Sequence, residues 1–280
     1  MSRFVLTLSC PDRPGVVAAV SGALAEYGCN IAESQQYGDP YEARFFMRVE
    51  FTGGDADGFR TAFAALAPEF SMEWELHDKA IKPRVLVMVS RLGHCLNDLL
   101  YRVRSGLLDI EVVAVVSNHP DLRPLTQSYG IDYHHLPVAP ETKGTQENEI
   151  LTLVNHYQAD LVVLARYMQI LSENLCAKLS GKVINIHHSA LPSFKGARPY
   201  HQAHSRGVKL IGATAHYVTS DLDEGPIIEQ EVARVDHTHD PDRLAAVGRD
   251  LECLALARAV RWHTDRRVLL NGGRTVVFRS

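Results

Sequence analysis

Two separate stretches of the sequence carry side chains that can move protons and stabilise charge. The first, INIHHSALPSFKGARPY, runs from Ile184 to Tyr200 and places Asn185, His187 and His188 at the end of an apolar run that is typical of a buried strand. Asn185 and His187 are two residues apart, so they share one face if the strand is extended. An Asn amide can donate to an oxygen that becomes an oxyanion, and a His can act as a general acid or base.

The second stretch, TAHYVTSDLDEGPIIEQ, carries acidic residues in a loop between two expected strands. It offers His216, Asp221, Asp223 and Glu224, and Gly225 permits a close approach of the backbone. A carboxylate beside an imidazole favours its protonated form and fixes its orientation. An Asn, a His and an Asp that met in one pocket would suit acyl transfer.

Each of these residues, taken alone, has a simpler interpretation. An Asn at a strand end is often a turn former, a lone His is often a core or surface group, and Asp-Glu before Gly is often a solvated turn. The chain has 14 His, but pairs such as His187-His188, His134-His135 and His237-x-His239 lack the spacings of a zinc site, so no metal is expected. The sequence contains no GxSxG nucleophile elbow and no P-loop.

Two different orders of strands and helices are expected along the chain, and they determine where these residues lie. The segment from Arg84 to Ser189 alternates nearly continuous apolar strands with helices, which predicts a mostly parallel, Rossmann-like sheet covered on both faces. Ligands bind at the carboxyl ends of such strands, where Asn185 and His187 fall. The first 78 residues have the order strand, helix, strand, strand, helix, strand, which is the ferredoxin-like βαββαβ arrangement. We therefore predict an α/β protein with domains at 1–78 and 85–280, joined by a linker at 79–84.

Bulk composition excludes several classes of partner. The 280 residues are 46% hydrophobic and carry a formal net charge of −4, so no basic face for nucleic acid is expected. No apolar run is long enough to cross a bilayer, and the N-terminus lacks the features of a signal peptide. The five Cys are odd in number and contain no CxxC pair, which indicates reduced thiols and a cytoplasmic protein.

Two stretches together resemble the formyltransferase domain that uses 10-formyltetrahydrofolate: NIHHSALPSFKGARPYHQA, followed by GATAHYVTSDLDEGPIIEQ. The resemblance extends from about Pro83 to the C-terminus and includes the Leu-Pro-x-Phe-x-Gly turn and the Asp-x-Gly-Pro-Ile-Ile element. It implies a catalytic trio of Asn185, His187 and Asp223. It also implies that LARYMQIL and the loop from Ser220 to Glu224 hold the folate. The implied folate-binding residues are Met168, Gln169, Ile170, Leu171, Asp221, Leu222 and Glu224.

The whole chain is similar to the formyltetrahydrofolate deformylases, which join this domain to an N-terminal ACT domain. Asn-x-His-His-Ser, with His188 as a supporting residue, resembles the deformylase form. The stretch SRLGHCLNDLLYR has one Gly93 where amine-accepting transferases have a Gly-rich phosphate loop. The resemblance implies hydrolysis of 10-formyltetrahydrofolate to tetrahydrofolate and formate, as part of one-carbon metabolism and purine biosynthesis, with no metal or redox cofactor. The role of the Arg91–His94 loop stays open.

CPDRPGVVAAVSGALAEYGCNI resembles the start of an ACT domain, a regulatory and oligomerisation unit. The turn Asp12, Arg13, Pro14 and Gly15 precedes a helix whose N–H groups could meet a small carboxylate, such as an amino-acid effector. The same turn is also a common way to start a helix. The resemblance implies a homo-oligomer. Two alternatives remain at this point: formyl transfer to an amine such as glycinamide ribonucleotide, or an amino-acid-binding regulator with an inactive catalytic domain.

Overall fold

The computed structural model describes residues 2–191 and 199–279 and divides the chain into two compact units. One unit comprises residues 1–82 together with 265–280, and the other comprises 83–264. The sequence placed 265–280 in the second domain, whereas these residues belong to the first unit. Of the Leu-Pro-x-Phe-x-Gly turn, Pro192, Phe194 and Gly196 lie outside the described residues.

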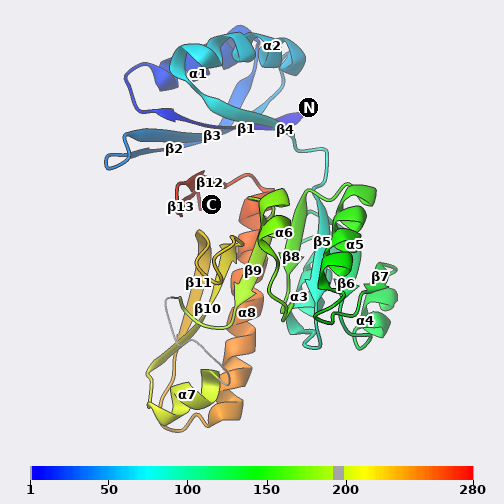
Figure 1. Ribbon diagram of the computed structural model, residues 1–280. Helices are drawn as coiled ribbons and strands as arrows, with labels where there is room; N and C mark the ends of the chain where they lie inside the picture. Colours follow the sequence, from blue (N-terminus) through cyan, green and yellow to red (C-terminus); the bar gives the residue numbers. More distant parts are fainter. Residues whose placement is uncertain (1, 192–198, 280) are drawn as a thin grey trace. The chain divides into compact units, whose positions relative to one another are not determined.

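The first unit has the predicted ferredoxin-like fold. Its four strands form one antiparallel sheet in the order β2-β3-β1-β4, and Figure 1 shows α1 and α2 on one face of that sheet. The elements are β1 (Arg3–Pro11), α1 (Val16–Glu26), β2 (Asn30–Asp39), β3 (Arg44–Thr52), α2 (Ala56–Leu66), a short 3-10 turn η1 (Ala67–Phe70) and β4 (Glu73–Asp78).

Local sequence signals set the boundaries of both helices in this unit. Gly28, in the left-handed conformation with φ 69, follows the C-terminus of α1, and its N–H donates to the carbonyl oxygen of Ala25 at 3.0 Å. The Asp55 side chain caps α2 by accepting from the Gly58 N–H at 3.0 Å. The buried rings of Phe59 and Phe63 on α2 then pack onto the sheet.

The C-terminal residues form a hairpin that belongs to the first unit. Its strands, β12 (Val268–Asn271) and β13 (Arg274–Val277), are joined by Gly272-Gly273. Arg267 contacts Glu33 at 2.9 Å, and the Asn271 amide donates to Asp39 at 2.7 Å. These polar contacts join residues more than 230 positions apart, so no local sequence pattern reveals them.

The second unit is built on a seven-stranded sheet with the order β11-β10-β9-β8-β5-β6-β7. Strands β5 to β9 run parallel to one another, and β10 and β11 add an antiparallel edge next to β9. The strands are β5 (Arg84–Val89), β6 (Glu111–Ser117), β7 (Asp132–His135), β8 (Leu161–Leu164), β9 (Val183–His187), β10 (Leu210–Tyr217) and β11 (Ile227–Arg234). The helices are α3 (His94–Arg104), α4 (Arg123–Ser128), α5 (Lys143–His156), α6 (Glu173–Lys178), α7 (Pro199–Ser205) and α8 (Pro241–Thr264).

Strands β5, β6 and β8 are buried on both faces because helices cover both sides, as their apolar runs predicted. The long helix α8 contacts α3, β9, β10 and β11, and Figure 1 shows it running along the sheet. Among the described helices, none is both long and apolar enough to cross a membrane. The strand order changes direction between β5 and β8, and the carboxyl ends of β5, β8 and β9 meet there, which is where open α/β sheets bind ligands.

Candidate active site

Strand β9 presents Asn185 and His187 on one face, as the two-residue spacing predicted. Its residues alternate, so that Ile184 and Ile186 are buried while Asn185 and His187 remain partly accessible. In the register with β10, Asn185 lies opposite His216. The face of β9 that carries the polar side chains therefore continues onto β10.

The loop between β10 and β11 brings Asp223 back to this face. Gly225 makes the turn feasible, since a Cβ at that position would lie 1.8 Å from the carbonyl oxygen of Tyr217. The Tyr217 N–H donates to the Pro226 carbonyl oxygen at 2.9 Å and closes the turn. Asp223 itself adopts a left-handed conformation with φ 57, which is rare outside Gly and often found at functional sites.

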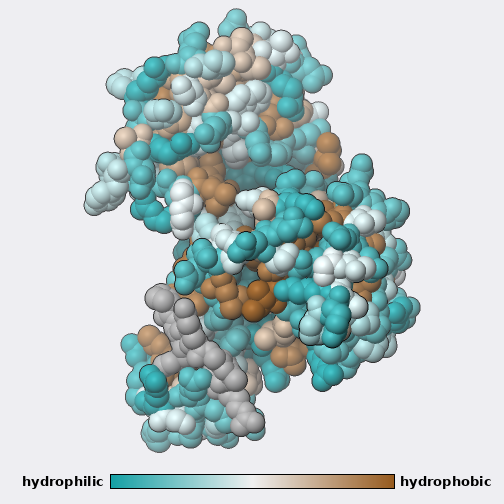
Figure 2. All heavy atoms as spheres, viewed as in Figure 1, coloured by the Kyte–Doolittle hydropathy of each residue, from teal (hydrophilic) through white to brown (hydrophobic). Residues whose placement is uncertain are grey.

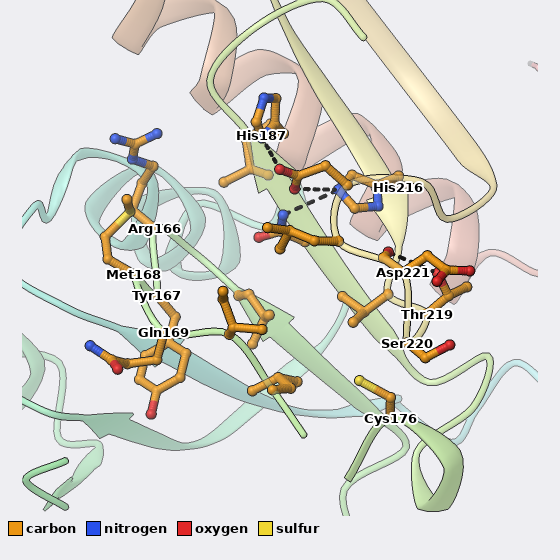
Figure 3. A pocket seen from close by; sticks show the side chains of 18 of the residues that line it. Arg166, Tyr167, Met168, Gln169, Cys176, His187, His216, Thr219, Ser220 and Asp221 are labelled. Atoms are coloured by element: carbon orange, nitrogen blue, oxygen red, sulfur yellow. Dashed lines mark hydrogen bonds and ion pairs between the residues drawn. The ribbon is translucent and has the colours of Figure 1, made fainter. Parts of the chain in front are cut away.

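Asp223, His187, His216 and Asn185 form one connected cluster, of which Figure 3 labels His187 and His216. Asp223 Oδ2 lies 3.1 Å from His187 Nδ1, and its Oδ1 lies 3.7 Å from His216 Nε2. The contact with His187, followed by that with His216, outweighs burial and holds the pKa of Asp223 well below its usual range. Asp223 therefore stays ionised at physiological pH, as a carboxylate that supports an imidazole must.

His216 fixes the orientation of the Asn185 amide. His216 Nδ1 lies 2.9 Å from the Tyr217 carbonyl oxygen, and a carbonyl can only accept, so Nδ1 carries the proton. Asn185 Nδ2, which can only donate, lies 3.1 Å from Nε2 of the same ring. The second amide hydrogen of Asn185 stays available for a ligand. The sequence analysis placed His216 on the loop but gave it no role; the cross-strand register between β9 and β10 is the signal that would have found it.

A cavity of about 230 Å³ opens beside this cluster, several times the volume of a single water molecule, and is therefore large enough for part of an organic ligand. Asn185, His187 and Asp223 line it. Residues that the sequence analysis connected with folate line it too: Met168, Gln169, Ile170, Leu171, Asp221 and Leu222. Glu224 is not among the lining residues.

The cavity wall is rich in exposed apolar groups. Met168, Ile170 and Leu222 are each more than half exposed, which is unusual for such large hydrophobic side chains. Figure 2 shows hydrophobic residues gathered among hydrophilic ones on the drawn face of this unit. Apolar side chains that stay uncovered at a cavity next to polar, oriented groups are typical of a small-molecule site.

His188 also lines the cavity, and its ring stacks on that of His187 with centroids 4.8 Å apart. Burial, followed by the charges of Arg166 and His187, lowers the pKa of His188 to about 4. His188 is therefore neutral at physiological pH, and it can hold water without adding a second positive charge beside His187.

A buried cluster of ion-paired side chains lies close to His188. Glu252, on α8, accepts from His94 Nε2 at 2.7 Å and from the Tyr200 hydroxyl at 3.2 Å, and Arg166 Nε lies 3.4 Å from it. Burial acts to raise the pKa of Glu252, but the His94 hydrogen bond and the Arg166 charge outweigh it and lower the pKa below its ordinary value. His94, which the sequence analysis left without a role, is thus part of this cluster.

The same cluster contains the candidate metal ligands of the described residues. Ligand atoms of His94, Cys95 and Glu252 lie within 4.8 Å of one another. However, the Glu252 carboxylate already contacts His94, Tyr200 and the Arg166 guanidinium, and a metal ion there would be repelled by the guanidinium charge. The donor set therefore fits an ion-pair network better than a metal centre.

The turn from Asp12 to Gly15 lies in the first unit, before α1. Gly15 precedes the helix with φ 96, and the Asp12 N–H donates to the Ala43 carbonyl oxygen at 2.9 Å. Arg13 donates to the Glu69 carbonyl oxygen and lies 4.2 Å above the Phe70 ring. The side chain of Arg13 is thus engaged within its own unit.

Two domain families match the chain. Residues 83–260 match the formyl transferase family, and residues 4–58 match the ACT domain family. The two matches correspond to the two units of the structure.

Two relatives that match nearly the full chain carry the same name. Formyltetrahydrofolate deformylase from Corynebacterium sp. (strain P-1) is 55% identical, with 99% of this chain and 98% of the relative covered. The protein of that name from Bacillus subtilis (strain 168) is 46% identical, with coverages of 98% and 93%.

Solved structures agree. The crystal structure of formyltetrahydrofolate deformylase from Burkholderia mallei has a TM-score of 0.97 at 54% identity over 100% of both chains. Glycinamide ribonucleotide transformylase 1 from Symbiobacterium toebii reaches a TM-score of only 0.67 at 27% identity, and covers 73% of this chain and 98% of its own.

Proposed function

The chain belongs to the family of formyltetrahydrofolate deformylases, and we propose that it hydrolyses 10-formyltetrahydrofolate to tetrahydrofolate and formate in the cavity lined by Asn185, His187 and Asp223. The observation that carries the proposal is the 3.1 Å contact between His187 and Asp223 beside the oriented Asn185 amide. An ionised carboxylate, an imidazole and an amide donor around one cavity supply what amide hydrolysis requires.

Asn185 binds the oxygen of the formyl group. One of its amide hydrogens is committed to His216, so the other is presented in a fixed direction. As water adds to the formyl carbon, this oxygen gains negative charge, and a preoriented donor stabilises the transition state. Loss of such a donor costs about 10² to 10³ in rate.

His187 and Asp223 transfer the protons. His187 takes a proton from the attacking water while Asp223 stabilises the positive imidazolium that results. His187 then gives this proton to the folate nitrogen as the carbon–nitrogen bond breaks. Water has then added to the formyl group, tetrahydrofolate leaves with its nitrogen protonated as N–H, and formic acid loses its proton to become formate.

His188 supports this step by holding the attacking water. Its neutral ring lies against His187 and has nitrogen atoms that can accept or donate a hydrogen bond. The folate rests against Met168, Ile170 and Leu222, whose apolar side chains are uncovered in the cavity. The remaining residues proposed to bind the folate are Gln169, Leu171, Asp221 and Glu224.

The regulatory part of the proposal concerns the first unit. We propose an amino-acid effector at the N–H groups that follow Asp12 to Gly15, and assembly of the chain into a homo-oligomer in the cytoplasm. The left-handed Gly15 before α1 supports the effector site, because it leaves the backbone at the helix start open. The deformylase activity would supply formate for purine biosynthesis and balance the one-carbon folate pool.

The test is to mix the protein with 10-formyltetrahydrofolate in the presence and absence of glycinamide ribonucleotide and to measure formate, tetrahydrofolate and formylated amine. We expect equal amounts of formate and tetrahydrofolate in both cases, and no formylated amine. His187→Ala should abolish formate release, whereas His201→Ala, an exposed histidine on α7, should not. Formylation of the amine without formate would establish a transferase instead.

A further inference from the structure

Arg166 lies in the cavity wall, and one of its side-chain donors lacks a hydrogen-bond partner. Its side chain is only 11% exposed, and its Nε is buried without a hydrogen-bond partner. Among the described residues, the ion pair of its guanidinium is with Glu252, at 3.4 Å from Nε. Buried guanidinium groups are ordinarily hydrogen-bonded, because an unsatisfied buried donor costs free energy.

The backbone at Arg166 adopts a strained conformation. Arg166 has φ 65, a left-handed conformation that costs a non-Gly residue free energy. Ser90, at the end of β5, holds the strained turn: its N–H donates to the Arg166 carbonyl oxygen at 3.2 Å, and its Oγ accepts from the Met168 N–H at 3.0 Å. The Ser90 hydroxyl in turn donates to Asn118 at 2.7 Å.

Arg166 lines the same cavity as Asn185 and His187. Figure 3 shows it on the opposite side of the cavity from Thr219 and Asp221, with its guanidinium directed toward the same end as the His187 ring. Arg166 is therefore a cation in the wall of the reaction cavity whose Nε lacks a hydrogen-bond partner.

We propose that Arg166 is the binding group for the carboxylate of the formate product, with its planar N–H fork paired to the two formate oxygens. The inference rests on the hydrolysis proposed above. The formyl group of the substrate is neutral, so the reacting group can pair with Arg166 as an anion only when hydrolysis is complete. Asp223 would repel the new anion, and Arg166 offsets that repulsion until formate leaves. Glu252, which competes for the same guanidinium, keeps the formate from being held too tightly.

The test is product inhibition of the full-length enzyme by formate. Arg166→Met removes the charge, and Arg166→Lys keeps the charge but loses the fork. Arg91→Met, an exposed arginine after β5, is the matched control. We expect the formate inhibition constant to rise about 10- to 100-fold in Arg166→Met, the size of one charge-assisted interaction. It should rise less in Arg166→Lys and stay unchanged in Arg91→Met.

An unchanged formate inhibition constant in either folded Arg166 variant would overturn the assignment. Because Arg166→Met removes a buried partner of Glu252, it could fail to fold, and Arg166→Lys then decides alone. If the deformylase proposal is wrong, a different result is expected, because the wild-type protein would then release no formate from 10-formyltetrahydrofolate. Titration of wild type and Arg166→Lys with ¹³C-labelled formate, followed by NMR, gives the same comparison without turnover.

Discussion

Replacement of His188 by Asn should flatten the acid sensitivity of the second unit. His188 is held neutral by burial first, and then by the charges of Arg166 and His187, while Glu252 and Asp223 oppose them, and its pKa falls to about 4. In the unfolded chain the same residue has the ordinary histidine pKa of about 6.5. At a pH between these two pKa values, His188 is therefore protonated in the unfolded chain but neutral in the folded chain.

The sign and size of the effect follow from this difference. The contribution of neutral His188 to stability is fully present above pH 6.5 and is lost progressively as the pH falls toward 4. Between pH 7 and pH 5, protonation of the unfolded chain at this residue lowers the free energy of unfolding by about 2 kcal/mol. Asn does not titrate, so His188→Asn should lack this part of the pH dependence, whatever its stability at pH 7.

Urea unfolding at pH 7 and pH 5 measures the effect in the second unit. The chain has two Trp, one in β4 and one in α8, so a Trp74→Phe background leaves Trp262 as the reporter of α8. His237→Asn, an exposed histidine in the same unit, is the control. If His188→Asn loses as much stability as wild type between the two pH values, then His188 is not buried as a neutral group and the reasoning fails.

Three further substitutions, one of them with a matched control, test other parts of the structure. His216→Phe should lower kcat about 10- to 100-fold with little change in KM, because Asn185 loses the acceptor that orients its amide; an unchanged kcat would exclude that role. Gly225→Ala should destabilise the second unit by about 1–3 kcal/mol and impair activity, since its Cβ would collide with the Tyr217 carbonyl. Gly144→Ala in α5, where a Cβ meets nothing, should instead be neutral or stabilising by about 0.5–1 kcal/mol, as thermal unfolding would show. Arg48→Met should destabilise the first unit by about 3–5 kcal/mol, because Glu50 would lose its buried partner at 3.1 Å; urea unfolding followed by Trp74 in a Trp262→Phe background checks this, and a loss under 1 kcal/mol would contradict it.

The sequence predicted what depends on local patterns. Continuous apolar runs between Arg84 and Ser189 predicted β5, β6 and β8. The spacing of Asn185 and His187 correctly placed them on one face of β9. Gly225 correctly indicated a tight turn.

What the sequence did not predict depends on distant contacts. The C-terminal hairpin joins the first unit through Arg267 and Asn271, whose partners lie near the start of the chain. The role of His216 depends on strand register, and the Glu252 cluster depends on the packing of α8 against α3. Neither is encoded in the spacing of residues within one element.

The central claim is that His187 and Asp223 act as one catalytic unit, and a double-mutant cycle on formate release tests it most directly. We expect His187→Ala and Asp223→Asn each to lower kcat by about 10² to 10⁴, and the double variant to be no slower than the slower single variant. Losses that multiply, or an Asp223→Asn variant that hydrolyses 10-formyltetrahydrofolate at the wild-type rate, would contradict the account.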